Sequence, residues 1–407
     1  MEKVKQLGLL KNKMDLKQQL NEMGEKAKAA SAVLNTAPSI QKNSFFDFAI
    51  KEIKSDQELI LMANHQDVAQ ARDAGKDAAF IDRLELNQDR LEGICATLEE
   101  IKLFPDPVGK ILANWDRPNG LNISRVSTPL GVIGIIFESR PNVASDAGGL
   151  CLKSGNAVIL RSGKDGLRSA SALVTAMQKA LLKAGLPKES IQIVPSENRE
   201  AATLMLEGLN GSIDVIVPRG GKSLVAEVEK SAKVPVFGHL EGICHVYVDE
   251  HADLKKALEI CINAKMRRTG ICGAAETILL HQKIATSFGP DLIAKLSSLN
   301  CEVRGCKKTL SLDRYVIPAT EEDWSTEYLA PIISIKVVDD AEEAIQHINS
   351  YGTGHTESII SEDLNSQNQF TASIDSAIVM INTSTQFADG GEFGLGGEIG
   401  IATGKFH

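Results

Sequence analysis

The sequence has no long apolar run and no excess of positive charge. None of its apolar stretches approaches the roughly 18 residues that a membrane-spanning helix needs, so this class of membrane protein is excluded. The 53 Asp and Glu residues outnumber the 44 Lys and Arg residues, which gives a net charge of −9. We therefore expect no nucleic-acid partner and no membrane partner, because both present anionic surfaces. Small anionic ligands stay open, since they need only a few Lys and Arg side chains.

A signal peptide and a paired set of cysteines are also lacking. Residues 1–30 are charged and amphipathic, whereas a secretory signal has a basic start followed by an apolar core. The seven cysteines are an odd number scattered along the chain, which favours free thiols in a reducing cytoplasm. The one close pair, Cys301 and Cys306, has no second pair and no histidine near it in the sequence. We expect no metal site there and no metal cofactor.

The first part of the chain has helical spacing. Apolar residues recur at three- and four-residue intervals over 16–34 and 45–75, and the second pattern ends at Gly75. Residues 105–131 are rich in Pro, Gly and Asn, so they predict turns around an extended arm.

From Gly131 onward, short apolar runs alternate with helical patterns. Strands are expected at 131–137, 157–161, 191–194 and 213–217, helices at 143–155, 166–185, 197–209 and 221–232, and the apolar residues 234–237 follow. Such alternation predicts an α/β fold with a parallel sheet and helices on both faces. A second alternating unit begins near Cys244, with strands at 244–250, 275–281, 331–339 and 377–384 and helices at 253–266 and 282–299. The break at 235–243 is the expected domain boundary.

Three turns that follow strands in the first unit combine small residues with charge. They are 162–165 (Ser-Gly-Lys-Asp), 195–197 (Pro-Ser-Glu) and 218–223 (Pro-Arg-Gly-Gly-Lys-Ser). Backbone N–H groups and the helix dipole at such turns suit phosphate groups. The usual GxGxxG fingerprint is missing from these positions, and ordinary strand-to-helix turns would have the same composition.

Cys272 stands in "RRTGICGAAET" (267–277), between two glycines. Lys265, Arg267 and Arg268 lie within seven residues of it, and nearby positive charge favours the nucleophilic thiolate. The flanking glycines would allow a ligand to approach closely. A structural cysteine in a turn fits the same residues, and the local sequence alone favours that interpretation over a nucleophile.

Seven segments together resemble the gamma-glutamyl phosphate reductases, a family of the aldehyde dehydrogenase superfamily that is also called glutamate-5-semialdehyde dehydrogenase. They are "TPLGVIGIIFESRPN" (128–142), "LKSGNAVILRSGKD" (152–165), "VPRGGKSLV" (217–225), "EGICHVYVDE" (241–250), "TGICGAAETILLH" (269–281), "YGTGHTESI" (351–359) and "INTSTQFADGGEFGLGGEIGI" (381–401). They occur in the family's order over nearly the whole chain.

The resemblance implies NADPH-dependent reduction of L-glutamate 5-phosphate to L-glutamate 5-semialdehyde and phosphate, the second step of proline biosynthesis from glutamate. It makes Cys272 the nucleophile, which would expel phosphate and form a thioacyl intermediate for hydride reduction. The alternatives are another acyl-phosphate or acyl-thioester reductase of the same fold, and a non-catalytic NADP-binding protein that kept the fold.

Two departures from the superfamily pattern bear on the chemistry. Oxidising aldehyde dehydrogenases have a water-activating glutamate in an "ELGGK"-type stretch, and His239 stands at that position here, with Glu241 two residues on. The loss of that base fits reduction, because water attack would waste the thioester. The superfamily asparagine of the oxyanion hole is displaced to Asn142. We expect the Cys272 backbone N–H to be the first oxyanion donor and Asn142 the second.

The resemblance also implies where ligands bind. For the cofactor, NADPH/NADP, it points to Arg161, Ser162, Gly163, Lys164, Gly220, Gly221 and Glu327. Arg161 and Lys164 would face the 2′-phosphate, and Glu327 would bind the nicotinamide ribose. For the substrate it points to Arg267, Arg268, His355, Thr356, Ser384 and Thr385, since Arg and hydroxyl groups suit carboxylate and phosphate.

An aldehyde dehydrogenase-like architecture follows from the resemblance. It has a Rossmann-type NADP-binding domain (1–112 and 128–236, with a helical N-terminal segment), an α/β catalytic domain (237–392) that carries the cysteine, and a small oligomerisation arm with a C-terminal segment (113–127 and 393–407). Relatives continue beyond "KFH" with a tail at the subunit interface, whereas this sequence stops at His407. We expect a cytoplasmic homo-oligomer with functional coupling to glutamate 5-kinase.

Overall fold

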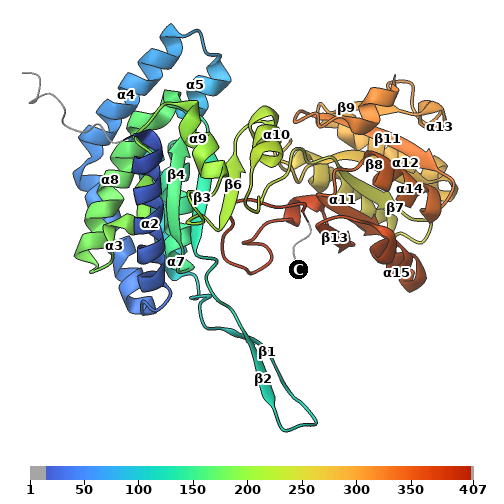
Figure 1. The fold of residues 1–407 in the computed structure, drawn as a ribbon. Coiled ribbons are helices and arrows are strands. Elements are labelled where there is room, and N and C mark those ends of the chain that lie inside the picture. Colours follow the sequence, from blue (N-terminus) through green and yellow to red (C-terminus); the bar gives the residue numbers. More distant parts are fainter. Residues whose placement is uncertain (1–14, 405–407) are drawn as a thin grey trace, which may run out of the picture. The chain divides into compact units, whose positions relative to one another are not determined.

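The computed structural model describes residues 15–404 and divides the chain after Phe237 into two compact units (Figure 1). Unit 1 runs to Phe237 and unit 2 begins at Gly238, one residue beyond the boundary expected from the sequence. Residues 1–14 of the expected cofactor domain and 405–407 of the expected C-terminal segment lie outside the described residues.

A parallel four-stranded sheet with the order β5-β4-β3-β6 forms the centre of unit 1. Its strands are β3 (Val132–Phe137), β4 (Ala157–Ser162), β5 (Ile191–Ile193) and β6 (Val215–Arg219). Every residue of β3 is buried, as expected for a strand that is covered on both faces. The apolar residues 234–237 do not form a further strand. They make one isolated bridge, between Ile216 and Val236, and Pro235 beside it has no N–H to donate to a ladder.

Helices surround this sheet (Figure 1). They are α2 (Leu16–Leu34), α3 (Ser39–Ser55), α4 (Gln57–Asp73), α5 (Ala78–Leu84), α6 (Gln88–Leu103), α7 (Val143–Lys153), α8 (Leu167–Lys183), α9 (Arg199–Leu206) and α10 (Lys222–Ser231), with short 3₁₀ turns η1 (Lys164–Gly166) and η2 (Lys188–Ser190). The helical pattern over 45–75 belongs to two helices, because the backbone leaves helical geometry at Asp56 (φ −93°, ψ 12°). No helix within residues 15–404 is both long and apolar enough to cross a membrane.

The predicted arm is an antiparallel hairpin that extends from the rest of unit 1 (Figure 1). Its strands are β1 (Ile111–Asp116) and β2 (Asn122–Val126), and nearly all of their residues are exposed. Several exposed side chains are large and apolar: Ile111, Leu112, Trp115, Leu121 and Val126. A two-stranded ribbon alone is marginally stable in water, so this surface suits contact with another chain.

Unit 2 is built on a parallel seven-stranded sheet with the order β10-β9-β11-β8-β7-β12-β13. The strands are β7 (Cys244–Val248), β8 (Ala275–His281), β9 (Glu302–Gly305), β10 (Ile317–Pro318), β11 (Ile332–Val338), β12 (Thr356–Ile360) and β13 (Ile378–Ile381). The helices are α11 (Leu254–Met266), α12 (Gln282–Ser298), α13 (Lys307–Leu310), α14 (Ala341–Tyr351) and α15 (Leu364–Ser373), with the 3₁₀ turns η3 (Glu321–Ser325) and η4 (Thr385–Phe387). The α/β fold of two parallel sheets with an added hairpin is confirmed.

Candidate active site

Three neighbouring strands of unit 2 bring Cys272 together with two histidines. His239 lies shortly before β7, Cys272 before β8 and His355 directly before β12. These strands are adjacent and parallel in the order β8-β7-β12, so the segments that lead into them meet at one edge of the sheet. The cluster therefore lies at the amino ends of its strands.

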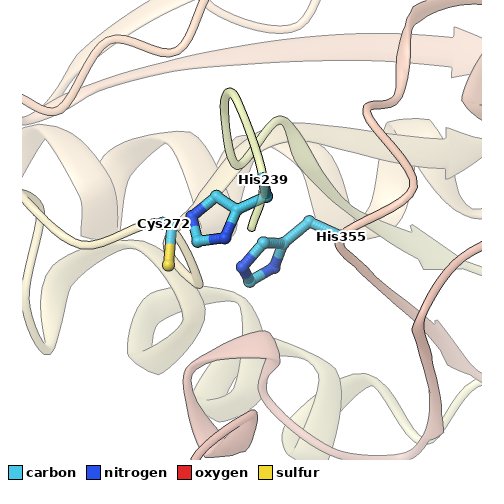
Figure 2. Close-up of side chains that lie close together, drawn as sticks. All are labelled: His239, Cys272 and His355. Atoms are coloured by element: carbon cyan, nitrogen blue, oxygen red, sulfur yellow. The ribbon is translucent and has the colours of Figure 1, made fainter. Parts of the chain in front are cut away.

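The three side chains are close enough for chemistry. One ligand atom of each, the Cys272 Sγ and a ring nitrogen of each histidine, lies within 4.8 Å of the other two. The two imidazole rings meet edge to face with their centroids 4.7 Å apart, and Figure 2 shows the thiol beside them. Cys272 and His239 are half-buried, while His355 is fully buried. The thiol is therefore partly accessible to solvent, whereas the His355 ring lies on the buried side of the cluster.

Hydrogen bonds decide which ring nitrogen of each histidine is available. His239 Nδ1 is 2.7 Å from the carbonyl oxygen of Ile401, which only accepts, so Nδ1 carries the proton and Nε2 keeps the lone pair. His355 Nδ1 is 2.9 Å from Thr356 Oγ1, and its buried Nε2 has no hydrogen-bond partner in the structure. Burial, and then the neighbouring His239, lower the pKa of His355 to about 3, so this ring is neutral at physiological pH.

The segment 241–243 fixes the backbone of Cys272. A Cβ on Gly242 would lie only 2.0 Å from the Cys272 carbonyl oxygen, so no other residue fits without moving that backbone. The same carbonyl accepts the Cys244 S–H at 3.1 Å. The Gly242 N–H donates to Glu327 Oε1 at 2.9 Å, and the Ile243 N–H donates to the Thr353 hydroxyl. Glu327, expected at the nicotinamide ribose, therefore lies next to the cysteine segment.

The cations near Cys272 in sequence are not directed at its thiol. Lys265 is fully buried and forms an ion pair with Glu276, and Arg267 pairs with Glu392 at 2.8 Å and stacks on a neighbouring ring. Arg268 is exposed and has no carboxylate partner among residues 15–404. The sequence argument that all three favour the thiolate is therefore wrong for Lys265 and Arg267, because carboxylates neutralise both. His239 is the polar group beside the thiol instead.

The hydroxyl residues expected at the substrate are buried near this edge. Thr356 contacts His355, and Ser384 caps η4 by accepting the Gln386 N–H. Thr385 has a buried Oγ1 without a hydrogen-bond partner. Its carbonyl oxygen lies near Gly273, the residue after Cys272, because a Cβ placed on that glycine would be 3.2 Å away. Thr356 and Thr385 thus approach the cysteine, whereas the Arg267 guanidinium is occupied by Glu392.

In unit 1, the residues expected at the cofactor meet at the carboxyl edge of the sheet. Phe137 at the end of β3 is paired with Ser162 of β4 and with Arg219 of β6. Gly163 and Lys164 follow β4, and Gly220 and Gly221 follow β6 into α10. This edge is where ligands bind in open α/β sheets.

Three features of this edge fit a phosphate-bearing cofactor. The Arg161 Nε is buried without a hydrogen-bond partner, and burial lowers the pKa of its guanidinium while Glu138 opposes that effect. A Cβ on Gly220 would lie 2.6 Å from the Leu224 Cδ2 and 2.9 Å from a Glu138 carboxylate oxygen, so a larger residue there would have to displace the ends of these two side chains. Gly221 has open space around it and precedes the N-terminus of α10, while Lys164 is exposed. An unpaired guanidinium, a helix N-terminus and an exposed ammonium are the donors that a dinucleotide phosphate requires.

Asn142 lies in unit 1, immediately before α7. Its side-chain amide donates to Asp146 at 2.8 Å. Burial raises the pKa of Asp146 to about 6, although hydrogen bonds from Asn142 and Ser145 oppose the shift. The expected oxyanion donor therefore already has a carboxylate partner on its own helix.

Sequence reasoning treated His239 only as the replacement for a lost glutamate. Its position beside Cys272 in the structure makes it a member of the site. The signal was present in "HLEGICH", because the superfamily position aligned with His239 is itself an active-site position. The contribution of Ile401 had no signal in the sequence. It shows that part of the expected C-terminal segment, 393–404, holds the His239 ring.

Comparison with known proteins identifies the family. The family model described as "Aldehyde dehydrogenase family" matches residues 9–308 and 316–401. A curated gamma-glutamyl phosphate reductase of Brucella suis biovar 1 is 55% identical over 393 residues, which cover 97% of this chain and 93% of that protein.

Solved structures agree at the level of the fold. The crystal structure of a gamma-glutamyl phosphate reductase from Thermotoga maritima matches with a TM-score of 0.89 at 44% identity, covering 95% of this chain and 93% of that one. An engineered glycolyl-CoA reductase with bound NADP+ matches with a TM-score of 0.62 at 18% identity over 94% of this chain and 90% of that one, which shows a shared fold.

Proposed function

Since the chain belongs to the aldehyde dehydrogenase family and, within it, to the gamma-glutamyl phosphate reductases, we propose that it reduces L-glutamate 5-phosphate to L-glutamate 5-semialdehyde and phosphate with NADPH. This is the second step of proline biosynthesis from glutamate. The observation that carries the mechanism is the Cys272 thiol beside the lone pair of His239 Nε2. A nucleophile next to a base that a third group orients is the arrangement of covalent catalysis.

Cys272 is the nucleophile in this mechanism. His239 Nε2 accepts the thiol proton, and the thiolate attacks the acyl carbon of the substrate. The bond from that carbon to the phosphate oxygen breaks, phosphate leaves, and a thioester remains on Cys272. NADPH, when bound, supplies the hydride that reduces this thioester. The tetrahedral oxyanion on Cys272 is stabilised by the Cys272 N–H. Its collapse releases the aldehyde and a thiolate, which recovers its proton from His239.

The replacement of glutamate by His239 suits this direction. The His239 ring is held through Nδ1 by the Ile401 carbonyl, so its one acceptor atom serves the thiol. His355 is buried and neutral, which keeps a second charge away from the cysteine and closes the floor of the site. Thioester hydrolysis needs a base positioned on a water molecule. At the thioester stage of this mechanism His239 Nε2 already carries the thiol proton, and His355 is fully buried.

We assign the cofactor to the carboxyl edge of the unit 1 sheet. Arg161, Ser162, Gly163 and Lys164 would hold the adenosine end, with Arg161 and Lys164 on the 2′-phosphate, and the N-terminus of α10 at Gly220 and Gly221 would bind phosphate. In unit 2, Glu327 is the residue that the family resemblance implies for the nicotinamide ribose, and its Oε1 accepts the Gly242 N–H in this structure. The substrate carboxylate and phosphate would use groups drawn from Arg267, Arg268, His355, Thr356, Ser384 and Thr385.

The proposed sites support the domain assignment made from the sequence. In it, residues 1–112 and 128–236 would be the NADP-binding domain, 237–392 the catalytic domain, and 113–127 with 393–407 the arm and C-terminal segment. The exposed apolar residues of the hairpin support a homo-oligomer formed through the arm. The seven cysteines, which all lie within the described residues, are free thiols, and this fits the proposed reducing cytoplasmic setting. Functional coupling to a glutamate 5-kinase is proposed on the family resemblance alone.

The reverse reaction tests the proposal most directly. Glutamate semialdehyde, phosphate and NADP should yield NADPH, and formation of NADPH at the same rate without phosphate would contradict the acyl-phosphate assignment. The Cys272→Ala variant should lose turnover and still bind NADPH, as measured by quenching or enhancement of nucleotide fluorescence. The matched control is Cys306→Ser, which removes the other half-buried thiol and should keep activity. Turnover retained by Cys272→Ala would exclude the covalent mechanism.

A further inference from the structure

The Cys272, His239 and His355 side chains also form a set of metal ligands. Their donor atoms lie within 4.8 Å of one another, and one thiolate with two imidazoles is a donor set that suits Zn²⁺. We propose that these three residues bind a zinc ion, or another divalent cation of similar softness, which reversibly blocks the enzyme at its nucleophile. This inference rests on the geometry of three side chains, and it adds an inhibitory site to the proposed reaction.

The histidines are prepared for a metal by their other hydrogen bonds. His239 donates from Nδ1 to the Ile401 carbonyl oxygen at 2.7 Å, which fixes the ring and leaves the Nε2 lone pair for a ligand bond. Metal-binding histidines in proteins commonly have such a carbonyl partner on the second nitrogen. His355 has the same arrangement when its Nδ1 donates to Thr356 Oγ1 at 2.9 Å.

An unsatisfied buried atom points to a ligand at this place. His355 is fully buried, and its Nε2 has no hydrogen-bond partner in the structure. A polar atom buried without a partner loses its hydrogen bond to water without replacement, and a metal ion would satisfy it. The close-up shows the His355 ring next to His239 and the Cys272 thiol, on the same side as the two other donors (Figure 2).

The site needs a small closure to reach bonding geometry. With Zn–S near 2.3 Å and Zn–N near 2.1 Å, tetrahedral ligand atoms lie roughly 3.5 Å apart, so separations of up to 4.8 Å must shrink by about 1 Å. Cys272 is half-buried on a turn, and rotation of its short side chain can supply this movement. The fourth position would take a water molecule, as in zinc sites that three protein side chains form.

Binding is a ligand exchange without a redox step. The hydrated cation loses water molecules, the Cys272 S–H bond breaks, and its proton goes to the buffer as the sulfur–metal bond forms. Each histidine contributes a lone pair and remains neutral. Because the thiolate is then held by the metal, it cannot attack the acyl carbon, and a chelator that removes the metal restores it.

Cobalt(II) serves as the probe, because a thiolate ligand gives a near-ultraviolet charge-transfer band and a tetrahedral site gives visible d–d bands. The full-length protein should develop both on titration with Co²⁺, and Zn²⁺ should displace them. Cys272→Ser should abolish the charge-transfer band, while His239→Gln and His355→Gln should each weaken cobalt affinity at least about tenfold. Cys306→Ser, which removes the other half-buried thiol, should leave the spectrum unchanged.

A charge-transfer band that persists in Cys272→Ser, or an affinity unchanged in both histidine variants, would overturn the three-ligand site. Alkylation read by mass spectrometry gives an answer that does not depend on these variants. Zinc should protect Cys272 from iodoacetamide at least about tenfold more than it protects Cys306, and EDTA should abolish the difference. Equal alkylation with and without zinc would contradict the proposal. Cobalt binding in a protein without reductase activity would support the metal site and refute the proposed reaction, so the two failures are distinguishable.

Discussion

Replacing Gly242 by alanine should displace Cys272, the proposed nucleophile, without removing any functional group. The new Cβ would lie 2.0 Å from the carbonyl oxygen of Cys272 and 2.6 Å from its Cα. These neighbours are backbone atoms, which cannot rotate away as a flexible side chain would. The strain must therefore be relieved by movement of the Cys272 turn or of the segment 241–243.

The required movement can be estimated from the contact. A Cβ atom is essentially never found closer than 3.0 Å to another heavy atom of this kind. The distance from the new Cβ to the Cys272 carbonyl oxygen, 2.0 Å before any movement, therefore has to increase by about 1 Å. Misplacement of a reacting group by that amount can lower the rate about 100-fold. The overpacked contact should also reduce the free energy of unfolding by about 1–3 kcal/mol. If the segment 241–243 moves, the N–H of residue 242 also shifts, and its hydrogen bond to Glu327 becomes weaker.

Initial rates of NADPH formation in the reverse reaction measure the effect. We expect kcat of Gly242→Ala to fall about 100-fold while NADPH affinity, which depends mainly on unit 1, changes little. The matched control is Gly270→Ala, two residues before Cys272. There the nearest atom to the new Cβ, the Leu329 carbonyl oxygen, is 3.9 Å away. This variant should keep kcat within a few-fold. Unchanged kcat in Gly242→Ala, or an equal loss in the control, would refute the argument from backbone contact.

Two buried charged groups give further predictions. Lys265→Met should lower the free energy of unfolding of unit 2 by about 3–5 kcal/mol, because it leaves Glu276 buried without its cation, and adding Glu276→Leu should recover part of the loss. Urea unfolding tests this when it is followed by the fluorescence of the buried Trp324 in a Trp115→Phe background. Equal stability of Lys265→Met and of Lys265→Met with Glu276→Leu would contradict the prediction. Burial raises the pKa of Asp146 to about 6, so its ionisation destabilises the fold increasingly as pH rises from about 4 to about 6 and fully above that range. Asp146→Asn should therefore raise the free energy of unfolding by roughly 2–3 kcal/mol at pH 8 and by almost nothing at pH 4. Scanning calorimetry measures this, and an equal increase in stability at both pH values would disprove the argument.

The strands that the sequence predicted best are those that contain a short run of β-branched and other large apolar residues. The expected strand at 275–281 coincides with β8, and the run at 131–137 contains β3. The strand β12 was not expected as a strand, because its sequence "TESII" begins with polar residues. All five residues are nevertheless buried, and Glu357 accepts hydrogen bonds from the backbone and ring of His245 in the neighbouring strand. A polar side chain that finds its partner across a sheet leaves no trace in the hydropathy of its own segment.

The candidate site shows the same division between local and distant information. Cys272 could be singled out from its glycine-flanked turn and from the family resemblance. Its surroundings could not be inferred from neighbours in the chain, because Lys265 turns into the core toward Glu276 and Arg267 turns toward Glu392. The side chains that do reach the thiol belong to the segments before β7 and β12.

The sequence by itself determined the α/β alternation, a division near residue 237 and the family, and through the family it made Cys272 the predicted nucleophile. These properties depend on local periodicity and on motifs that are read along the chain. Only the tertiary structure decided which groups surround Cys272. Adjacent parallel strands bring the residues that precede them to one edge of the sheet, so His239 and His355 meet the cysteine although they lie far from it in sequence. Strand order is set by the packing of the whole unit, and no short stretch of the sequence encodes it.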